Sequence, residues 1–213
     1  LKDVSKQLVI SPPLNPSQYK VSPTTGASKK ITLELKDSLM ENTTYTFNFG
    51  ESIIDFNESN PTSYLTYTLS TGETIDSLYI KGSILDAFEK ETESFISLQL
   101  YPVDSTYKDS TIYTRKPLYV TSTLDTTIYK FQNLRAGKYA IIALEDKSGN
   151  YFFDQSIDKI GFINRLIELP KDSIINLRLF KEKTNFEWDK PYFVNDHHIK
   201  LAYYGDYNNE TYK

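Results

Sequence analysis

The clearest indication of the fold is the stretch Thr44-Tyr-Thr-Phe-Asn-Phe49. In it, large aromatic side chains alternate with threonine and asparagine. Successive side chains of an extended chain point to opposite faces, so the stretch would place its aromatic rings on one face and its polar groups on the other. This pattern predicts a β-strand with one buried face, as the two layers of a β-sandwich require.

The same alternation recurs along most of the chain, in short segments bounded by turn residues. We expect strands at 7–10, 18–21, 31–35, 44–49, 65–69, 78–84, 96–100, 116–123, 128–134, 137–145, 165–169, 174–180 and 199–204. Residues 139–144 are apolar without interruption, which predicts a central strand covered on both faces. The helical period is nearly absent. The sequence therefore predicts an all-β protein built as tandem Ig-like or Greek-key β-sandwiches.

Composition and charge exclude several classes of function. The 213 residues contain 24 Lys and Arg against 28 Asp and Glu, for a net charge of -4, and no basic stripe, so we expect no nucleic-acid partner. With no cysteine and two histidines, thiol catalysis, disulfides and thiolate zinc sites are excluded. The longest apolar run is far shorter than the roughly 20 residues of a membrane helix. We expect a non-catalytic protein with no cofactor.

Three motifs of the first third carry a family resemblance. They are Asn42-Thr-Thr-Tyr-Thr-Phe-Asn-Phe-Gly50, then Ile54-Asp55 with Asn57-Glu-Ser-Asn60, and then Leu69-Ser-Thr-Gly72. Together they resemble the bacterial Ig-like domain of the S-layer (SbsA) type, over about residues 6–73. In that family further strands precede this piece, so the resemblance implies a sandwich that the sequence enters partway through.

A second resemblance lies at Tyr129-Lys-Phe-Gln-Asn-Leu-Arg-Ala-Gly-Lys-Tyr139. This stretch is similar to the strand-turn-strand of carboxypeptidase-regulatory-like, transthyretin-like sandwiches. The tandem resembles the N-terminal half of large outer-membrane-associated lipoproteins of Gram-negative bacteria. It implies a place in the bacterial cell envelope at the outer membrane, an upstream lipid anchor, and an outer-membrane protein or protein complex as partner. These families share no reaction.

The turn-rich segment 70–74 marks a domain boundary. We expect an Ig-like sandwich lacking its first strands at 1–73, a transthyretin-like sandwich at 74–180, and a tail or the start of a third β domain at 181–213. Because the sequence begins at Leu1 without a charged-then-apolar leader, we expect an internal piece of a longer protein.

One loop combines oxygen-bearing side chains at short spacing. Asp146, Ser148, Asn150 and Asp154 are placed to curl around a hard cation such as calcium. The match to an EF-hand is poor, because Gly149 falls two places early and the twelfth position holds no Glu. An Asx-rich hairpin is the simpler interpretation. The loop from Asp55 to Asn60 has the same ambiguity, and backbone capping is favoured there.

Other candidate groups point to surface chemistry more than to catalysis. Paired carboxylates at Glu51 and Asp55, or at Asp154 and Asp158, are interpreted as surface charge, and His197 and His198 as solvated loop residues. Aromatic side chains could stack on sugar rings or form an interface. They are Tyr107, Tyr113, Trp188, Tyr192, Tyr203, Tyr204 and Tyr207.

The leading prediction is a non-catalytic scaffold that supports an outer-membrane protein complex. Two alternatives stay open. One is a carbohydrate-binding module of a surface polysaccharide-handling system, with Tyr and Trp side chains as its platform. The other is an accessory domain attached to an enzyme beyond Lys213.

Overall fold

The computed structural model describes residues 4–24, 26–55, 60–61, 65–92, 95–123, 126–183 and 187–204. Within these ranges almost every element is a β-strand, which confirms the predicted all-β class. The helical elements are α1 (Val4–Gln7), α2 (Thr111–Thr114) and a 3-10 turn at Pro16–Gln18. None of the described helices is long and apolar enough to cross a membrane.

The first unit is a thin sandwich. Its sheet has the order β1 (Val9–Ser11), β4 (Thr44–Asn48) and β5 (Thr66–Ser70), all antiparallel. The hairpin of β2 (Tyr19–Ser22) and β3 (Thr32–Leu35) covers one face of that sheet. The aromatic side chains of residues 44–49 lie between the two layers, where Phe47 is fully buried and Tyr45 is 1% exposed. The predicted alternation is confirmed here.

The second unit contains two sheets. One has the order β11-β10-β7-β8, with β12 also paired to β10, and the other has the order β13-β6-β9. Their bounds are β6 (Leu78–Asp86), β7 (Ser97–Pro102), β8 (Tyr119–Ser122), β9 (Ile128–Leu134), β10 (Gly137–Glu145), β11 (Lys159–Phe162), β12 (Ile167–Leu169) and β13 (Leu177–Leu179). A bridge between Ile160 and Phe180 joins the two sheets along one side.

The main core of this unit fills the space between its two sheets. Ile80, Leu98 and Ala143 are fully buried there, together with the aromatic rings of Tyr129 and Phe131. Within the second sheet, the segment that leads into β13 runs very close to β6, because a Cβ added at Gly82 would lie 1.6 Å from the carbonyl oxygen of Ile175. No other residue fits that position without moving the backbone.

Several details differ from the sequence prediction. Strand β13 pairs parallel to β6, because the chain crosses from one sheet to the other between Pro170 and Asn176. Residue 7 belongs to α1, so the expected strand at 7–10 is instead Val9–Ser11. The sequence did not indicate α2 or β11, because both are four residues long and show no clear period.

β11 and β12 form one strand interrupted by a bulge. Ile142 pairs with Phe162, and Tyr139 pairs with Ile167, so residues 163–166 lie opposite the two residues 140–141. The extra residues leave the ladder and loop outward. Bulges of this kind redirect side chains and are common beside functional sites.

The two units are joined by polar contacts. The Asn133 side-chain amide donates to the hydroxyls of Thr46 and Thr68, at 2.8 and 3.1 Å. The backbone N–H of Val120 donates to the Ser11 hydroxyl at 3.1 Å. Since these bonds cross between sheets with separate cores, they fix the first unit against the second. We propose that the domain boundary lies between residues 73 and 74, because the two units have separate hydrophobic cores.

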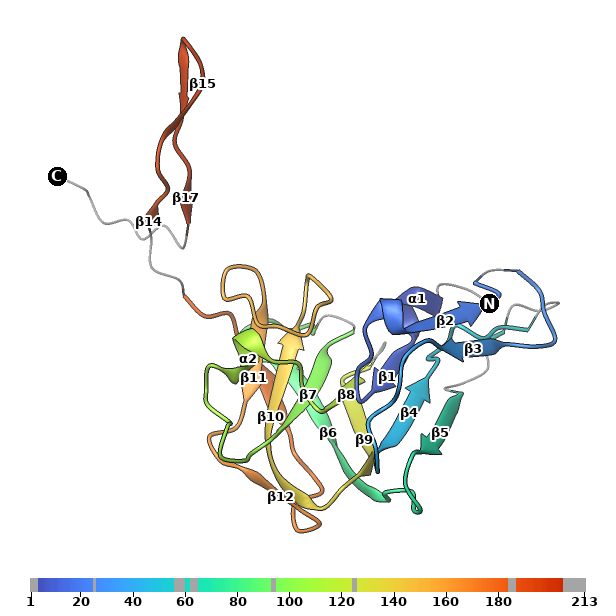
Figure 1. The fold of residues 1–213 in the computed structure, drawn as a ribbon. Helices are drawn as coiled ribbons and strands as arrows, with labels where there is room; N and C mark the ends of the chain where they lie inside the picture. Colours follow the sequence, from blue (N-terminus) through green and yellow to red (C-terminus); the bar gives the residue numbers. More distant parts are fainter. Residues whose placement is uncertain are drawn as a thin grey trace.

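Residues 187–204 form a separate ladder. It consists of β14 (Glu187–Trp188), β15 (Tyr192–Asn195), β16 (His198–Lys200) and β17 (Tyr203–Tyr204). β14 pairs with β17 and β15 with β16, and Figure 1 shows the ladder standing away from both sandwiches. We call residues 187–204 the C-terminal hairpin. The strand expected at 199–204 is thus two short strands.

Candidate functional site

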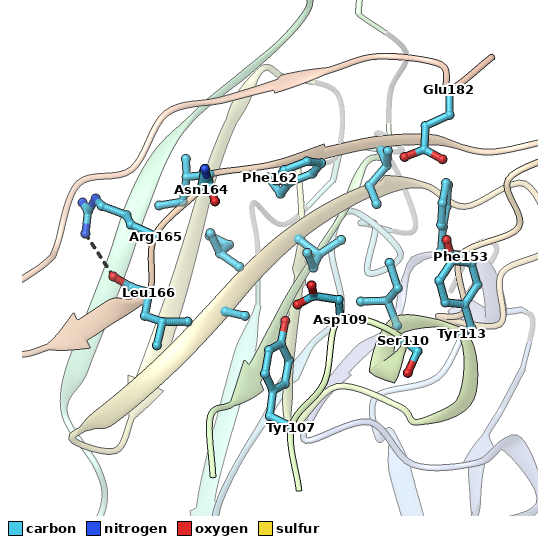
Figure 2. Close-up of a pocket in the computed structure, with 16 residues that line it drawn as sticks. Tyr107, Asp109, Ser110, Tyr113, Phe153, Phe162, Asn164, Arg165, Leu166 and Glu182 are labelled. Carbon is cyan, nitrogen blue, oxygen red and sulfur yellow. Dashed lines mark hydrogen bonds between the residues drawn. The ribbon is translucent and has the colours of Figure 1, made fainter. Parts of the chain in front are cut away.

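A hollow lined by described residues lies on the outer face of the sheet that contains β10. Its volume is about 570 Å³, within the usual range of roughly 300 to 1,000 Å³ for ligand sites. Figure 2 shows its lining. One wall comes from residues 107–113, the other from the bulge at 163–166, and Glu182 lies at one end. We call this hollow the outer groove.

The floor of the outer groove is aliphatic because β10 is apolar on both faces. Tyr139, Ile141 and Ala143 pack into the main core, whereas Ala140 and Ile142 belong to a second cluster on the outer face. The second cluster also contains residues from α2, β11 and the β10–β11 connection. They are Ile112, Phe153 and Ile160.

Local hydrogen bonds hold the first wall in shape. Asp104 accepts from the backbone N–H of Thr106 at 2.7 Å and from its hydroxyl at 2.6 Å, and these bonds lower the pKa of Asp104. Farther along, Thr111 accepts from the backbone N–H of Lys108 at 3.0 Å. Asn, Asp, Ser and Thr side chains commonly stabilise turns in this way. The wall therefore presents Asp109 and its neighbours from an ordered turn.

The bulge wall is held by an ion pair at its base. Arg165 Nη1 lies 3.1 Å from Asp172 Oδ2 and donates to the carbonyl oxygen of Leu166 at 3.2 Å. Asp172 also accepts from the backbone N–H of Glu168. That bond, followed by the one from Arg165, lowers the pKa of Asp172. The only cation among the lining residues is thus already neutralised.

Two carboxylates lie beside tyrosines in the groove. Asp109 is near Tyr107, whose pKa is raised by burial and further by this carboxylate. Glu182 is near Tyr113, whose pKa is raised by burial and then by Glu182. Figure 2 shows Asp109 in the middle of the groove and Glu182 at the end above Phe153. Among the described residues neither carboxylate has an ion-pair partner.

The loop considered for calcium uses its oxygens to bind the backbone. Asp146 accepts from the N–H groups of Gly149 and Tyr151, and Asn150 accepts from the N–H of Phe152, each at 2.7 Å. Asp154 accepts from the N–H and hydroxyl of Ser156. These contacts support the Asx-rich interpretation. Within the described ranges, no group of three or more His, Cys, Asp or Glu side chains could hold a metal ion.

The carboxylates and histidines singled out from the sequence make local hydrogen bonds. Asp158 is fully buried and accepts from the N–H groups of Lys147 and Asp154, so it closes the loop and is not the surface charge that the sequence predicted. His198 Nδ1 lies 2.9 Å from Asn195 Oδ1 at an exposed turn. Glu51 donates its backbone N–H to Gln7. Most of the loop from Asp55 to Asn60, residues 56–59, lies outside the described residues.

The aromatic residues singled out from the sequence divide into two groups. Tyr107 and Tyr113 line the outer groove. Trp188, Tyr192 and Tyr203 lie exposed on the C-terminal hairpin, where the Trp188 and Tyr203 rings meet edge to face at 6.2 Å. The side chain of Tyr204 and the whole of Tyr207 lie outside the described residues.

Sequence reasoning missed the outer groove as a site. The apolar run at 139–144 was a usable signal, since a strand that is apolar on both faces needs a cover on each, and here the outer cover is incomplete. Nothing in the sequence links Asp109 to Glu182, because the bulge and the wall between them arise from tertiary pairing.

A model of the bacterial Ig-like domain family matches residues 1–71, the first third of the chain. This match covers the first unit and agrees with the resemblance of residues 42–72. Domains of this family are generally non-catalytic modules exposed at the cell surface. No curated protein and no solved structure matches the chain. The S-layer subtype and the transthyretin-like identity of the second unit stay predictions.

Proposed function

We propose that this chain is a non-catalytic scaffold of the bacterial cell envelope, associated with the outer membrane, which supports a membrane protein complex. The family match of residues 1–71 supports a surface interaction module. The observation that carries the proposal is the outer groove, which joins an apolar floor to a partly polar rim on a face that the described elements cover only in part. Protein interfaces have this anatomy of an apolar centre and a polar rim.

The polar bonds between the units suit a scaffold role. Because Asn133 binds Thr46 and Thr68 across the junction, the first unit is held at a defined angle to the groove. A rigid pair of sandwiches can hold two partners at a fixed separation, whereas a flexible linker would leave that separation variable. An upstream lipid anchor at the outer membrane belongs to this proposal and rests on the family resemblance.

The proposal is tested by native purification of the full-length protein from detergent-solubilised envelope, followed by mass spectrometry. We expect outer-membrane proteins in stoichiometric amounts. A protein that purifies alone at matched expression would contradict the scaffold function.

A carbohydrate-binding module is the second candidate, and the exposed Trp188–Tyr203 pair favours it. Aromatic rings of this kind can stack on sugar faces. Glycan-array binding by the purified chain that disappears in Trp188→Ala, and persists in the exposed-strand control Glu34→Gln, would establish this function. Absence of glycan binding would remove it.

A further inference from the structure

We propose that the outer groove binds an extended segment of a partner protein in which a lysine or arginine side chain stands beside aliphatic side chains. This inference rests on the proposed scaffold function and names the chemistry of the partner. Four features of the groove support it, namely its floor, its rim, its charge and its shape.

The floor can bury aliphatic side chains. Ala140 and Ile142 are 8% and 7% exposed and form the bottom of the groove. The rim adds large apolar side chains that are still exposed, namely Tyr113, Phe162 and Leu166, at 46 to 48%. Removing such an apolar surface from water favours the formation of a complex.

The charge of the groove favours a cationic group on the partner. Its lining holds two carboxylates and one guanidinium, and that guanidinium already pairs with Asp172 at 3.1 Å. Next to Glu182, the Lys181 ammonium is turned to the carbonyl oxygens of Gln155 and Asp158. Glu182 itself accepts a bond from the neutral amide of Gln155 at 2.8 Å. The residues that line the groove therefore keep an excess of negative charge.

A lysine or arginine side chain complements both the apolar floor and the negatively charged residues of the lining. Its alkyl stem can lie on the aliphatic floor while its charged head stays at the wetter edge. There the head would meet a carboxylate and a tyrosine ring, either Asp109 with Tyr107 or Glu182 with Tyr113. Aromatic faces and carboxylates both attract cations.

The groove also suits an extended backbone. It runs between the wall at 107–113 and the bulge at 163–166, and its rim offers the Ser110 hydroxyl and the Asn164 amide as hydrogen-bonding groups. Sugars present hydroxyl groups on most sides and would leave an aliphatic floor poorly matched. The C-terminal hairpin carries exposed aromatic side chains too, but nothing in the structure indicates what would cover it.

The test is affinity selection from a synthetic library of capped random octapeptides on the immobilised full chain, read by mass spectrometry. We expect enrichment of Lys or Arg next to Leu, Ile or Val. In the double variant Asp109→Asn with Glu182→Gln, which removes both possible partners of the single cation, binding of the selected peptides should weaken roughly fivefold, as expected for one rim charge pair. Glu34→Gln, on an exposed strand of the first unit, is the matched control.

Charge reversal should change which peptides are selected, a result that unfolding of the variant cannot produce. The variant Asp109→Lys with Glu182→Lys should instead enrich Asp or Glu in the selected peptides, while its thermal unfolding stays close to that of the parent chain. Absence of any enriched peptide, or enrichment that neither variant changes, would overturn the inference.

Native purification separates this inference from the scaffold function. If envelope partners co-purify equally with the parent chain and with the Asp109→Asn, Glu182→Gln variant, the scaffold stands and the groove inference fails. If selected peptides bind through the groove but no envelope protein co-purifies, the groove inference stands and the scaffold function fails.

Discussion

The two β-hairpins β2–β3 and β15–β16 have strands of similar length and opposite surroundings. In β2–β3, alternate side chains are half-buried against the aromatic cluster of the first unit. In β15–β16 every side chain is exposed, although Phe193 and Ile199 stand opposite each other on one face. Paired strands therefore form in both places, but only a second layer turns them into part of a core. A two-stranded hairpin without such a layer has marginal stability in water.

The largest expected effect comes from removing a ring beneath the buried hairpin. Phe47→Ala should lower the free energy of unfolding by about 3 to 5 kcal/mol, because the side chain is fully buried. The matched change Phe193→Ala, at a position 74% exposed, should cost less than about 0.5 kcal/mol. Urea unfolding followed by circular dichroism measures both. Similar losses in the two variants would mean that both hairpins are covered.

The next effect concerns charge buried in the second unit. Lys159 Nζ lies 2.8 Å from both Asp86 Oδ2 and Glu89 Oε1, and the Asp86 side chain is 4% exposed. Asp86→Asn should cost about 2 to 4 kcal/mol, because it leaves a partly buried ammonium with a weaker partner. Asp196→Asn in the C-terminal hairpin is the exposed control. An equally small effect of both changes in urea unfolding would contradict the network.

The same carboxylate makes stability depend on pH. Burial opposes the ionisation of Asp86, but hydrogen bonds from Lys159 and from the N–H groups of Phe88 and Glu89 outweigh it and hold its pKa below the ordinary value. Its contribution is therefore complete above the unfolded pKa of about 3.9 and is lost as pH falls through the lower folded pKa. Unfolding measured between pH 7 and pH 2 should show this loss, and a smaller one in Asp86→Asn. An identical pH dependence in both proteins would exclude Asp86 as its source.

A smaller effect is expected at the junction of the two sandwiches. Asn133 has a positive φ of 58°, so Asn133→Gly removes its two side-chain hydrogen bonds while keeping a residue that tolerates this backbone. We expect a loss of about 1 to 2 kcal/mol. Asn195→Gly, at the exposed turn, should leave global unfolding unchanged. Hydrogen exchange that rises in β4 and β9 of Asn133→Gly alone would locate the effect at the junction.

The smallest effect is expected at Trp188. It is the only tryptophan and is 57% exposed, so Trp188→Ala should change the unfolding free energy by less than about 0.5 kcal/mol. In the parent chain its fluorescence should be that of a solvated indole and should be quenched readily by iodide. Poor quenching, with a large loss of stability in the variant, would show that the C-terminal hairpin is covered.

Local patterning predicted the strands better than the arrangement between them. The double-faced apolar run predicted β10 with its observed bounds, Gly137–Glu145, because burial on both faces is a property of that segment alone. The parallel pairing of β6 with β13 was not predictable from either segment, since alternation does not encode strand direction.

The outer groove depends on information that no single segment holds. Its bulge wall follows from a shift between the β10–β11 and β10–β12 registers, which becomes visible only when both pairings are known. Asp146 and Asp158 show the converse case. The sequence indicated both as candidate site residues. In the structure their carboxylates accept backbone N–H hydrogen bonds that close the loop.

Hydrogen exchange on the full-length protein, free and in the complex purified from the envelope, tests whether the outer groove carries the interaction. We expect complex formation to slow exchange in residues 107–113 and 163–166, whereas the C-terminal hairpin should exchange at the same rate in both states. Slower exchange confined to the hairpin, with the two groove walls unchanged, would contradict it.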